Sequence, residues 1–398
     1  MNICHVWDSE YPWDVRAEKV SRSLTAAGHE VHLVARNRDG RSLEEALEEA
    51  TIHRMRPLRW LPATVDRAMM FPAFFNPRWL RLIRGVAEDR HADLILCRDL
   101  PLAPAAIFVG RRLRIPVVLD MAENYPAMIR SVWDHGLQGP LDWALRNPKL
   151  VEAVERWVVA RVDHVIVVVE ESARRLEKMG VCGKDLTVVV NTPLRSRIPA
   201  RPISASNDET LDLVYLGLLE KPRGIDVVLD AVATCRNWSI PVRLLLIGDG
   251  RDIPGFRRRA ADLGLEDGVV RFAGYVPYEQ ALDRLARADV GLVPHHPNES
   301  WNSTIPNKLF DYMALGLPVI TSDAKPAARV VRETGCGVVY PGTSAEALSE
   351  AIQRLSDRNT RKQLGVAGYR AVQRRYNWDV DGNRLVECLE AVVESERL

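Results

Sequence analysis

Short apolar runs alternate with segments of helical periodicity along almost the whole chain, and this alternation restricts the fold more than any other feature. The pattern starts with a run at 2–7, a helix predicted from about Val15 to Ala27, and a second run at 31–35. Runs that are apolar at nearly every position are typical of parallel strands covered on both faces. A strand, a helix and a strand in this order form a βαβ unit, so we expect parallel α/β sheets.

The alternation stops once and then starts again, which predicts two domains. Further strands are expected at 93–97, 115–120, 164–169 and 186–190 in the first half, and at 211–217, 243–247, 269–276 and 288–294 in the second. Residues 194–209 are rich in Pro, Ser and Arg, as linkers are. We therefore expect a first Rossmann-like domain at 1–193, a linker at 194–209, a second domain at 210–375 and a final helical segment at 376–398.

Composition restricts the function and the compartment. The chain has 398 residues, 47% of them hydrophobic and 27% charged, and its net charge of +1 argues against a general nucleic-acid binder. Its six cysteines form no CxxC pair, so we expect neither a zinc site nor a disulfide framework. Several fall in apolar runs and are expected to be buried thiols in a reducing, cytoplasmic compartment. Asp8 and Glu10 argue against a signal peptide, and no apolar run reaches the length of a membrane span.

Residues 303–321 predict a loop, a helix, a stop and a short buried strand, in that order. Ser303 and Thr304 are favourable N-cap residues, and Pro306 suits the first helical turn. Gly316 is expected to end the helix. The polar residues are thus grouped at the N-terminal end of this helix.

Lys308 and Asp311 give the start of the helix a chemical character. The free N–H groups and partial positive charge of a helix N-terminus attract phosphate and disfavour a lysine in the first turn. Lys308 therefore suggests an anionic ligand, and Asp311 suits the hydroxyl groups of a ribose. The same residues fit a capped surface helix with a solvated Lys308–Asp311 pair equally well.

This stretch resembles the donor-binding segment of the family 4 (group 1) retaining glycosyltransferases, which have the GT-B fold. The family pattern is a Glu, seven residues, a second Glu, and a helix that ends in Gly-x-Pro-Val-Ile. Asp311 stands at the second Glu, and Ser303 replaces the first, which contacts the donor sugar in the family. The resemblance covers nearly the whole chain. It implies two Rossmann-like domains facing an interdomain cleft, with acceptor binding by the first, nucleotide-sugar binding by the second, and a last helix that crosses back to the first.

The resemblance assigns the donor diphosphate to basic residues of the second domain. Lys308 is one, and Arg223 stands where many members have a Lys; Leu218 replaces a family Arg, for which Lys221 is a candidate substitute. Arg223 can grip a phosphate through two parallel hydrogen bonds. The other candidate donor-binding residues are Thr304, Pro306, Asn307, Gly217, Gly248, Gly250, Gly274 and Tyr275, the last of which is expected to stack on the base.

Acids after the strand at 115–120 are candidates for catalysis, because ligands of open α/β sheets bind at the carboxyl ends of strands. Related sequences often read Asp-x-His-Glu in this loop, and here Ala122 replaces the His. Asp120 and Glu123 remain, so acceptor activation either rests on Glu123 or needs no side-chain base. The alternative is that both acids cap the following helix.

Four further charged residues of the first domain are assigned to the acceptor or sugar pocket. Asp14 and Arg16 resemble a branch of the family with Asp-x-Arg at this turn. Arg16 is either a phosphate or acceptor contact or part of a surface salt bridge. Arg98 and Asp99 follow the strand at 93–97 directly.

The loop after the strand at 288–294 holds His295, His296 and Glu299. Adjacent histidines are potential metal ligands, but we favour a role in lining the sugar pocket or none. Glu299 lies near the vacant acidic position at Ser303 and is a candidate substitute for the missing Glu. We assign His295, Glu299 and Ser303 to the sugar pocket and expect no metal.

Residues 54–90 hold eight arginines against three acids, interleaved with aromatic residues. Such a segment is suited to an anionic membrane surface or to a lipid-linked acceptor. The alternative is a helical pair with its aromatics in the core and its arginines solvated. We slightly favour this alternative, because Pro62, Pro72 and Pro77 prevent one long amphipathic helix.

Taken with the resemblance, these features predict a retaining glycosyltransferase of polysaccharide biosynthesis. It would move a sugar from a nucleotide-sugar to a glycan, lipid-linked or small-molecule acceptor, with the nucleotide-sugar as co-substrate and no cofactor. Two alternatives remain: a GT-B-like sugar-nucleotide epimerase, and a nucleotide-sugar-binding scaffold without catalysis. We expect a cytoplasmic protein, placed at the inner face of the cell membrane as a peripheral protein if 54–90 contacts lipid.

Overall fold

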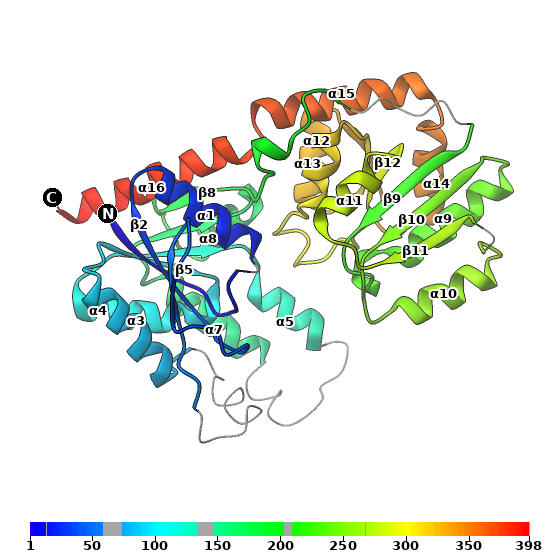
Figure 1. Cartoon of the computed structure of the whole chain (residues 1–398). Coiled ribbons are helices and arrows are strands. Elements are labelled where there is room, and N and C mark those ends of the chain that lie inside the picture. Colours follow the sequence, from blue (N-terminus) through cyan, green and yellow to red (C-terminus); the bar gives the residue numbers. More distant parts are fainter. Residues whose placement is uncertain (13, 59–73, 134–146, 203–208, 267, 398) are drawn as a thin grey trace. The chain divides into compact units, whose positions relative to one another are not determined.

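The computed structural model describes residues 1–12, 14–58, 74–133, 147–202, 209–266 and 268–397 (Figure 1). The chain divides into two compact units, Met1–Asn191 with Val380–Leu398, and Thr192–Asp379. Each unit contains a single, mostly parallel sheet with helices packed against it. The α/β class expected from the alternation of apolar runs is therefore confirmed in both units.

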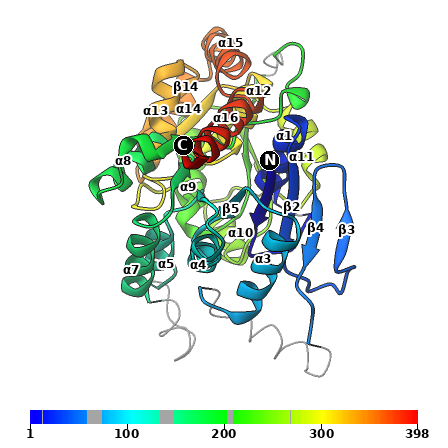
Figure 2. The same ribbon diagram turned by 90° about the vertical axis from the view of Figure 1, so that its left-hand side faces the viewer.

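The sheet of the first unit has eight strands in the order β3-β4-β2-β1-β5-β6-β7-β8. They are β1 (Asn2–Val6), β2 (Glu30–Ala35), β3 (Glu44–Ala46), β4 (Thr51–Arg54), β5 (Leu94–Arg98), β6 (Val117–Met121), β7 (His164–Val167) and β8 (Leu186–Val188). Neighbours are parallel except the antiparallel pair β3 and β4, which Figure 2 shows side by side at one edge of the sheet. These two strands were not predicted, because they are short and lack a continuous apolar run.

The helices of the first unit include one from the far end of the sequence. They are α1 (Val15–Ala26), α3 (Pro77–Asp89), α4 (Ala103–Leu113), α5 (Tyr125–Trp133), α7 (Pro148–Val159), α8 (Glu170–Lys178) and most of α16 (Trp378–Arg397). Asp381 of α16 accepts a hydrogen bond from the Val190 backbone N–H at 3.2 Å. Glu390, further along the same helix, lies 3.1 Å from His29 Nε2. The final helix therefore packs on the first unit.

The core of the first unit contains part of the segment 54–90. Residues 59–73 lie outside the described part of the chain, so the predicted helical pair is described only in α3. Trp79 and Ile83 of that helix are fully buried and pack in one cluster with Ile95 of β5. Burial of an aromatic side chain of this size is among the larger single contributions to a core. Trp79 is thus a core residue, as the structural alternative expects.

The sheet of the second unit has six strands in the order β11-β10-β9-β12-β13-β14, all parallel. They are β9 (Leu211–Leu216), β10 (Val242–Ile247), β11 (Val270–Gly274), β12 (Val290–Val293), β13 (Val319–Ser322) and β14 (Gly337–Tyr340). The helices are α9 (Ile225–Asn237), α10 (Ile253–Asp262), α11 (Tyr278–Leu285), α12 (Lys308–Leu315), α13 (Lys325–Thr334), α14 (Ala345–Arg354) and α15 (Arg358–Arg374). Because all six strands are parallel, their carboxyl ends share one edge of the sheet.

Helix α12 begins later than the sequence suggests. Its N-cap is Asn307, not Ser303 or Thr304, and Gly316 ends it in the left-handed conformation at φ +77°, as predicted. The Ser303 hydroxyl instead donates to the carbonyl oxygens of Glu299 at 2.7 Å and Ser300 at 3.1 Å. Ser303 therefore closes a separate turn before the helix, which places Lys308 at the first helical position.

The cysteines and the helices bear on the expected compartment and on the membrane. All six cysteines are free. Cys4, Cys97, Cys235 and Cys336 are buried, as expected, whereas Cys182 is exposed and Cys388 is half-buried. Within the described part of the chain, no helix combines the length and apolar character that crossing a membrane requires.

Candidate active site

Glycines allow two loops to meet at the carboxyl edge of the second sheet. Gly217 follows β9 and Gly248 follows β10, and both have positive φ, +133° and +137°. A Cβ on Gly248 would lie only 2.0 Å from the Gly217 carbonyl oxygen, and one on Gly250 2.2 Å from that of Leu219. Only residues without a Cβ fit such an approach. Three predicted ligand-binding glycines thus build the floor of one site.

Lys308 extends its ammonium group over this floor. A Cβ on Gly217 would lie 2.9 Å from Lys308 Nζ, which sits 3.7 Å from the centre of the Tyr215 ring. The Nζ atom is buried and has no hydrogen-bond partner among the described residues. Burial and the Arg223 guanidinium lower the pKa of Lys308 well below its ordinary value, against the opposing effect of Asp311. Lys308 is therefore a buried amine whose pKa is lowered and whose Nζ has no hydrogen-bond partner among the described residues.

Arg223 and His295 form a second part of the same site. Arg223 Nη1 donates to His295 Nε2 at 3.2 Å, and its guanidinium lies 4.5 Å from the Trp301 ring centre. His295 meets the same indole edge-on at 4.1 Å. Burial, followed by Lys308 and Arg223, lowers the pKa of His295 well below its ordinary value, so the ring is neutral. Because Nε2 accepts, the proton is on Nδ1, which has no partner among the described residues.

A further glycine fixes this loop in place. Gly224 has φ +72°, and a Cβ there would lie 2.0 Å from the Pro294 carbonyl oxygen. The turn that carries Arg223 therefore rests directly on the backbone that leads to His295. This contact fixes the position of the loop that carries Arg223 relative to the loop that carries His295, although the two are far apart in the sequence.

Asp311 is engaged by a residue that the sequence did not single out. The Tyr278 hydroxyl donates to Asp311 Oδ1 at 2.7 Å, and the Arg197 guanidinium lies 5.2 Å from the Tyr278 ring centre. Burial and the Asp311 carboxylate together raise the pKa of Tyr278. The only sequence signal for Tyr278 is its place at the start of a helix, behind Pro277.

The remaining predicted residues of the second unit fall into buried and exposed groups. Thr304 and Pro306 are buried, whereas Asn307, Lys221 and Glu299 are exposed. Tyr275 is 75% exposed after β11, where Gly274 has φ +70°. The carbonyl oxygen of Gly274 accepts from the Gly248 N–H at 2.9 Å, which ties that loop to the glycine floor.

The two adjacent histidines point to different partners. His295 faces Arg223, whereas His296 Nε2 lies 3.4 Å from Asp226 Oδ1. Among the described residues, no group of three His, Cys, Asp or Glu side chains is placed to hold a metal ion. The pair is therefore split between two contacts.

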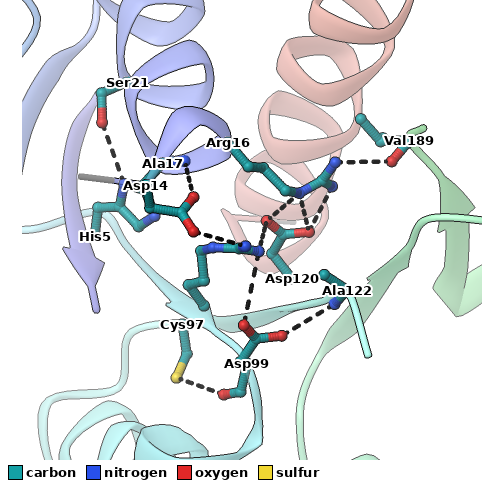
Figure 3. Close-up of polar contacts among 11 residues, drawn as sticks. His5, Asp14, Arg16, Ala17, Ser21, Cys97, Asp99, Asp120, Ala122 and Val189 are labelled. Carbon is teal, nitrogen blue, oxygen red and sulfur yellow. Dashed lines mark hydrogen bonds and ion pairs between the residues drawn. The ribbon is translucent and has the colours of Figure 1, made fainter. Parts of the chain in front are cut away.

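In the first unit, Asp120 is buried at the carboxyl end of β6 (Figure 3). Arg16 Nε donates to its Oδ2 at 2.9 Å and Nη2 to its Oδ1 at 2.6 Å, while Arg16 Nη1 donates to the Val189 carbonyl at 3.0 Å. Arg16 is 1% exposed, so its salt bridge is buried, whereas the alternative expected one at the surface. Asp120 is 0% exposed and Arg16 holds its carboxylate, while its predicted catalytic role stays a prediction.

Arg98 joins three carboxylates around this pair. Its Nη2 donates to Asp14 Oδ2 at 3.1 Å, and its Nη1 lies 3.8 Å from Asp99 and 3.6 Å from Asp120. Asp14 also caps α1 by accepting from the Ala17 N–H at 2.7 Å. We call Asp14, Arg16, Arg98, Asp99 and Asp120 the first-unit charge cluster.

The cluster shifts the pKa values of Asp99 and Asp120, at the carboxyl ends of β5 and β6, in opposite directions. Burial alone would raise the pKa of Asp120, but Arg16 and Arg98 hold it below its ordinary value. Burial raises the pKa of Asp99 in spite of Arg98. Asp99 also accepts from the Ala122 N–H at 3.1 Å. The cluster therefore fixes the start of the loop that carries Glu123.

Glu123 is partly exposed and remains the acidic residue of this loop that can face a ligand. The suggestion that Asp120 and Glu123 cap the next helix is wrong for Asp120. Asn124, which is 1% exposed, accepts from the Ala127 N–H at 3.2 Å at the start of α5. Asn124 is thus a capping residue that the sequence interpretation missed.

Comparisons with known families place both halves of the chain. A model described as "Glycosyl transferase 4-like domain" matches residues 14–192, and one described as "Glycosyl transferases group 1" matches 210–358. Phosphatidyl-myo-inositol mannosyltransferase of Mycobacterium leprae is 29% identical over 58% of this chain and 59% of that protein. The colanic acid biosynthesis glycosyltransferase WcaL of Escherichia coli is 25% identical over 58% of this chain and 57% of that protein. The chain thus spans about three fifths of these relatives' length.

Solved structures match the fold over nearly the full length. Sucrose-phosphate synthase of Thermosynechococcus elongatus has a TM-score of 0.73 at 19% identity and covers 99% of both chains. HepE of Anabaena, in complex with UDP and glucose, has a TM-score of 0.71 at 15% identity, covering 98% of this chain and all of that one. The names of these proteins give no support to an epimerase or a scaffold without catalysis. With both halves matching family models and the whole chain matching their two-domain fold, the protein belongs to the group 1 glycosyl transferases with the GT-B fold.

Proposed function

We propose that this protein transfers a sugar from a nucleoside diphosphate sugar to an acceptor hydroxyl, with retention at the anomeric carbon. The observation that carries the proposal is the buried Lys308 ammonium, which has no hydrogen-bonded counter-ion among the described residues but has Arg223 and the glycine loops beside it. Burying a charge without a partner is costly, so such a site is expected where a ligand supplies the opposite charge. A diphosphate fits two neighbouring cations and a backbone floor.

The reaction breaks the bond between the anomeric carbon and the diphosphate oxygen and forms one to the acceptor oxygen. Negative charge then develops on the leaving phosphate, and fixed cations stabilise it more in the transition state than in the substrate. Lys308 and Arg223 supply this charge in the proposed mechanism. The acceptor loses its proton, for which the partly exposed Glu123 is the side chain that we propose as base.

The other subsites follow from the same residues. We propose that Asp311 accepts hydrogen bonds from the ribose hydroxyls and that the exposed Tyr275 ring stacks on the base. His295 Nδ1–H, buried and without a partner among the described residues, is proposed to donate to a sugar hydroxyl. The Ser303 hydroxyl is engaged by two backbone carbonyls, so Ser303 is left out of this pocket.

The class of donor and acceptor is proposed from the names of relatives. Several are phosphatidylinositol-type mannosyltransferases, and two are named as dependent on GDP-mannose. We therefore propose a GDP- or UDP-hexose as donor and a lipid-linked acceptor. Contact with an anionic membrane is proposed through the described basic part of 54–90, in which Arg81 is exposed on α3.

A donor screen followed by turnover tests the function. Thermal shifts are measured with GDP-, UDP-, ADP- and TDP-sugars, and free nucleotide is measured with and without phosphatidylinositol vesicles, in EDTA. We expect one donor to stabilise the protein and nucleotide release to require acceptor. Lys308→Ala should strongly slow nucleotide release and weaken the stabilisation by the donor, whereas the exposed matched lysine variant Lys325→Ala should change neither. Stabilisation by no nucleotide-sugar, or nucleotide release that is unchanged in Lys308→Ala, would contradict the proposal.

Salt and charge reversal test the membrane contact separately. Sedimentation with vesicles that contain phosphatidylglycerol is compared between the wild type and Arg78→Glu/Arg81→Glu. We expect weaker binding by the variant and at higher ionic strength, because salt screens exposed charges. Binding that is absent at low salt, or equal in both proteins, would contradict the membrane contact without affecting the donor site.

A further inference from the structure

The second unit carries two adjoining pockets at the amino edge of its sheet, opposite to the glycine floor. The larger, of about 740 Å³, lies beside the first residues of β9, β10 and β11 and the end of α11. The smaller, of about 120 Å³, lies before β12 and β13 and against the first turn of α15. Both are lined by Ala288, so they adjoin. We call these two pockets the amino-edge pockets.

The larger pocket is lined by four arginines and one acid. Its charged lining residues are Arg243, Arg271, Arg284, Arg287 and Asp212. The Asp212 carboxylate is paired with Arg243, which donates to both of its oxygens, at 2.6 and 2.8 Å. The side chains of Arg271, Arg284 and Arg287 have no hydrogen bond or ion pair with the described residues. Within that part of the chain, three guanidinium groups are therefore uncompensated at this pocket.

The smaller pocket repeats the arrangement on a smaller scale. Its charged lining residues are Arg358, Arg361, Lys362 and Asp289. Asp289 is 1% exposed and lies 3.6 Å from Arg361 Nε, and Arg361 Nη1 donates to two backbone carbonyls at 2.8 Å. This pair holds the start of α15 against the sheet. Arg358 and Lys362 are exposed, and neither side chain pairs with a described residue.

Together the amino-edge pockets carry seven basic and two acidic side chains, a net charge of +5, in a chain whose net charge is +1. Both acids are held in ion pairs, Asp212 with Arg243 and Asp289 with Arg361, which leaves five cations for a ligand. Arginine presents paired N–H groups that match the oxygens of phosphate. We propose that this edge binds a phosphate-bearing anion, either a free polyphosphate or an anionic phospholipid headgroup. No aromatic side chain lines either pocket among the described residues, so the surface lacks the stacking platforms of single-stranded nucleic-acid sites.

Isothermal titration with inorganic tripolyphosphate tests the site in the full chain. Four proteins are compared: the wild type, Arg271→Gln/Arg287→Gln at the edge, the matched control Arg258→Gln/Arg370→Gln, and Lys308→Ala at the proposed donor site. The control removes two exposed arginines of the same unit that line neither pocket. Thermal unfolding of each variant confirms that it is folded, and Arg358→Gln/Lys362→Gln provides a second edge variant.

We expect the edge variants to lose about tenfold or more in affinity for tripolyphosphate, while the control and Lys308→Ala retain the wild-type affinity for this edge. Vesicles with and without phosphatidylglycerol then separate the sources. If the edge variants lose vesicle binding and Arg78→Glu/Arg81→Glu keeps it, the ligand is a lipid headgroup. If the edge binds tripolyphosphate but no vesicles, the ligand is a free anion. The proposal is overturned if the wild type binds neither probe, or if the edge variants and the control bind them equally.

Discussion

The buried charged side chains of the first unit form ion pairs with one another, whereas Lys308 and Arg223 at the candidate active site of the second unit form no ion pair with a described residue. In the first-unit charge cluster, two arginines face three aspartates, and every carboxylate accepts a hydrogen bond from an arginine or a backbone N–H. In the second unit, Lys308 and Arg223 lie beside a neutral His295, and the Lys308 ammonium has no hydrogen-bond partner among the described residues. Both groups lie at the carboxyl edge of a parallel sheet.

The difference distinguishes charge that builds a fold from charge that awaits a ligand. Desolvation opposes both groups, but only the first-unit cluster recovers the cost within the protein. The lowered pKa of Asp120 shows this for that carboxylate, whereas burial raises the pKa of Asp99. At Lys308 the pKa shift goes the other way, towards the neutral form. Ionisable residues of similar burial can therefore be sorted into structural and functional ones by whether partners are present.

The largest expected effect is on stability in the first unit. Asp120→Ala leaves Arg16 buried without its carboxylate, and we expect a loss of about 3–5 kcal/mol in unfolding free energy. Urea unfolding of the full chain measures it. Asp212→Ala, which removes one partner of the half-exposed pair with Arg243, should cost about 0–1 kcal/mol. Similar losses of unfolding free energy in both variants would show that burial does not make the Asp120 ion pair more important for stability than the half-exposed pair of Asp212.

At the second-unit site, we expect removal of a charge to reduce activity strongly without reducing stability. Lys308→Met should lower kcat by about 10²–10³-fold, because the charge on the leaving phosphate is no longer stabilised. The melting temperature should be unchanged or higher, since an unpaired buried charge is removed. A variant that is both inactive and less stable than the exposed control Lys325→Met would make Lys308 a structural residue.

The stability of Lys308→Met relative to the wild type should also depend on pH. The pKa of Lys308 is lower in the folded than in the unfolded chain, so the unfolded chain binds more protons. This lysine therefore destabilises the fold fully below its folded pKa, and the penalty disappears as pH rises to about 10.4. The gain in unfolding free energy from Lys308→Met should shrink with rising pH, which urea unfolding at several pH values measures. A constant difference would contradict a lowered pKa.

Donor binding should take up a proton at this site. A diphosphate beside Lys308 favours the charged ammonium, so the pKa rises on binding. Above the pKa of the free site, donor affinity should fall with rising pH by up to about tenfold per unit. Titration calorimetry in buffers of different ionisation enthalpy measures the proton, and Lys308→Met should show none. Binding without proton exchange in the wild type would mean that Lys308 is already charged.

Most strands and helix α12 were predictable because their signals are local. Apolar runs mark β1 and β9, and Gly316 by itself predicts the left-handed residue that ends α12. Lys308 was predicted to meet an anion from its place in the first turn, and its unpartnered ammonium fits that prediction. These inferences each use residues within one or two helical turns of one another.

What the sequence could not supply is pairing over long distances. Arg16 and Asp120 are 104 residues apart, and nothing in either local pattern indicates that they meet. Arg16 therefore lies in a buried ion pair and not in a surface one, and its partner is the carboxylate of Asp120. Tyr278 was missed for the same reason, since Asp311 is 33 residues away. The capping role of Asn124, by contrast, is local and could have been predicted.

The smallest expected effect concerns Tyr278, whose hydroxyl supplies a hydrogen-bond partner for Asp311 at the second-unit site. Tyr278→Phe removes the hydroxyl that donates to Asp311 at 2.7 Å but keeps the ring beneath Arg197. If Asp311 binds the ribose, the freed carboxylate loses orientation, and we expect donor affinity to fall by about 0.5–1.5 kcal/mol. Asp311→Ala should cost about 1–3 kcal/mol in donor affinity, and the double variant should cost no more than Asp311→Ala alone, because Tyr278 acts through that carboxylate.

Calorimetric titration of the three variants with the donor identified in the screen measures this coupling. A 2′-deoxy donor should lose affinity for the wild type but little more for Asp311→Ala. Additive losses in the double variant would mean that Tyr278 contacts the donor by itself, and equal sensitivity of wild type and Asp311→Ala to the missing hydroxyl would remove Asp311 from the ribose subsite.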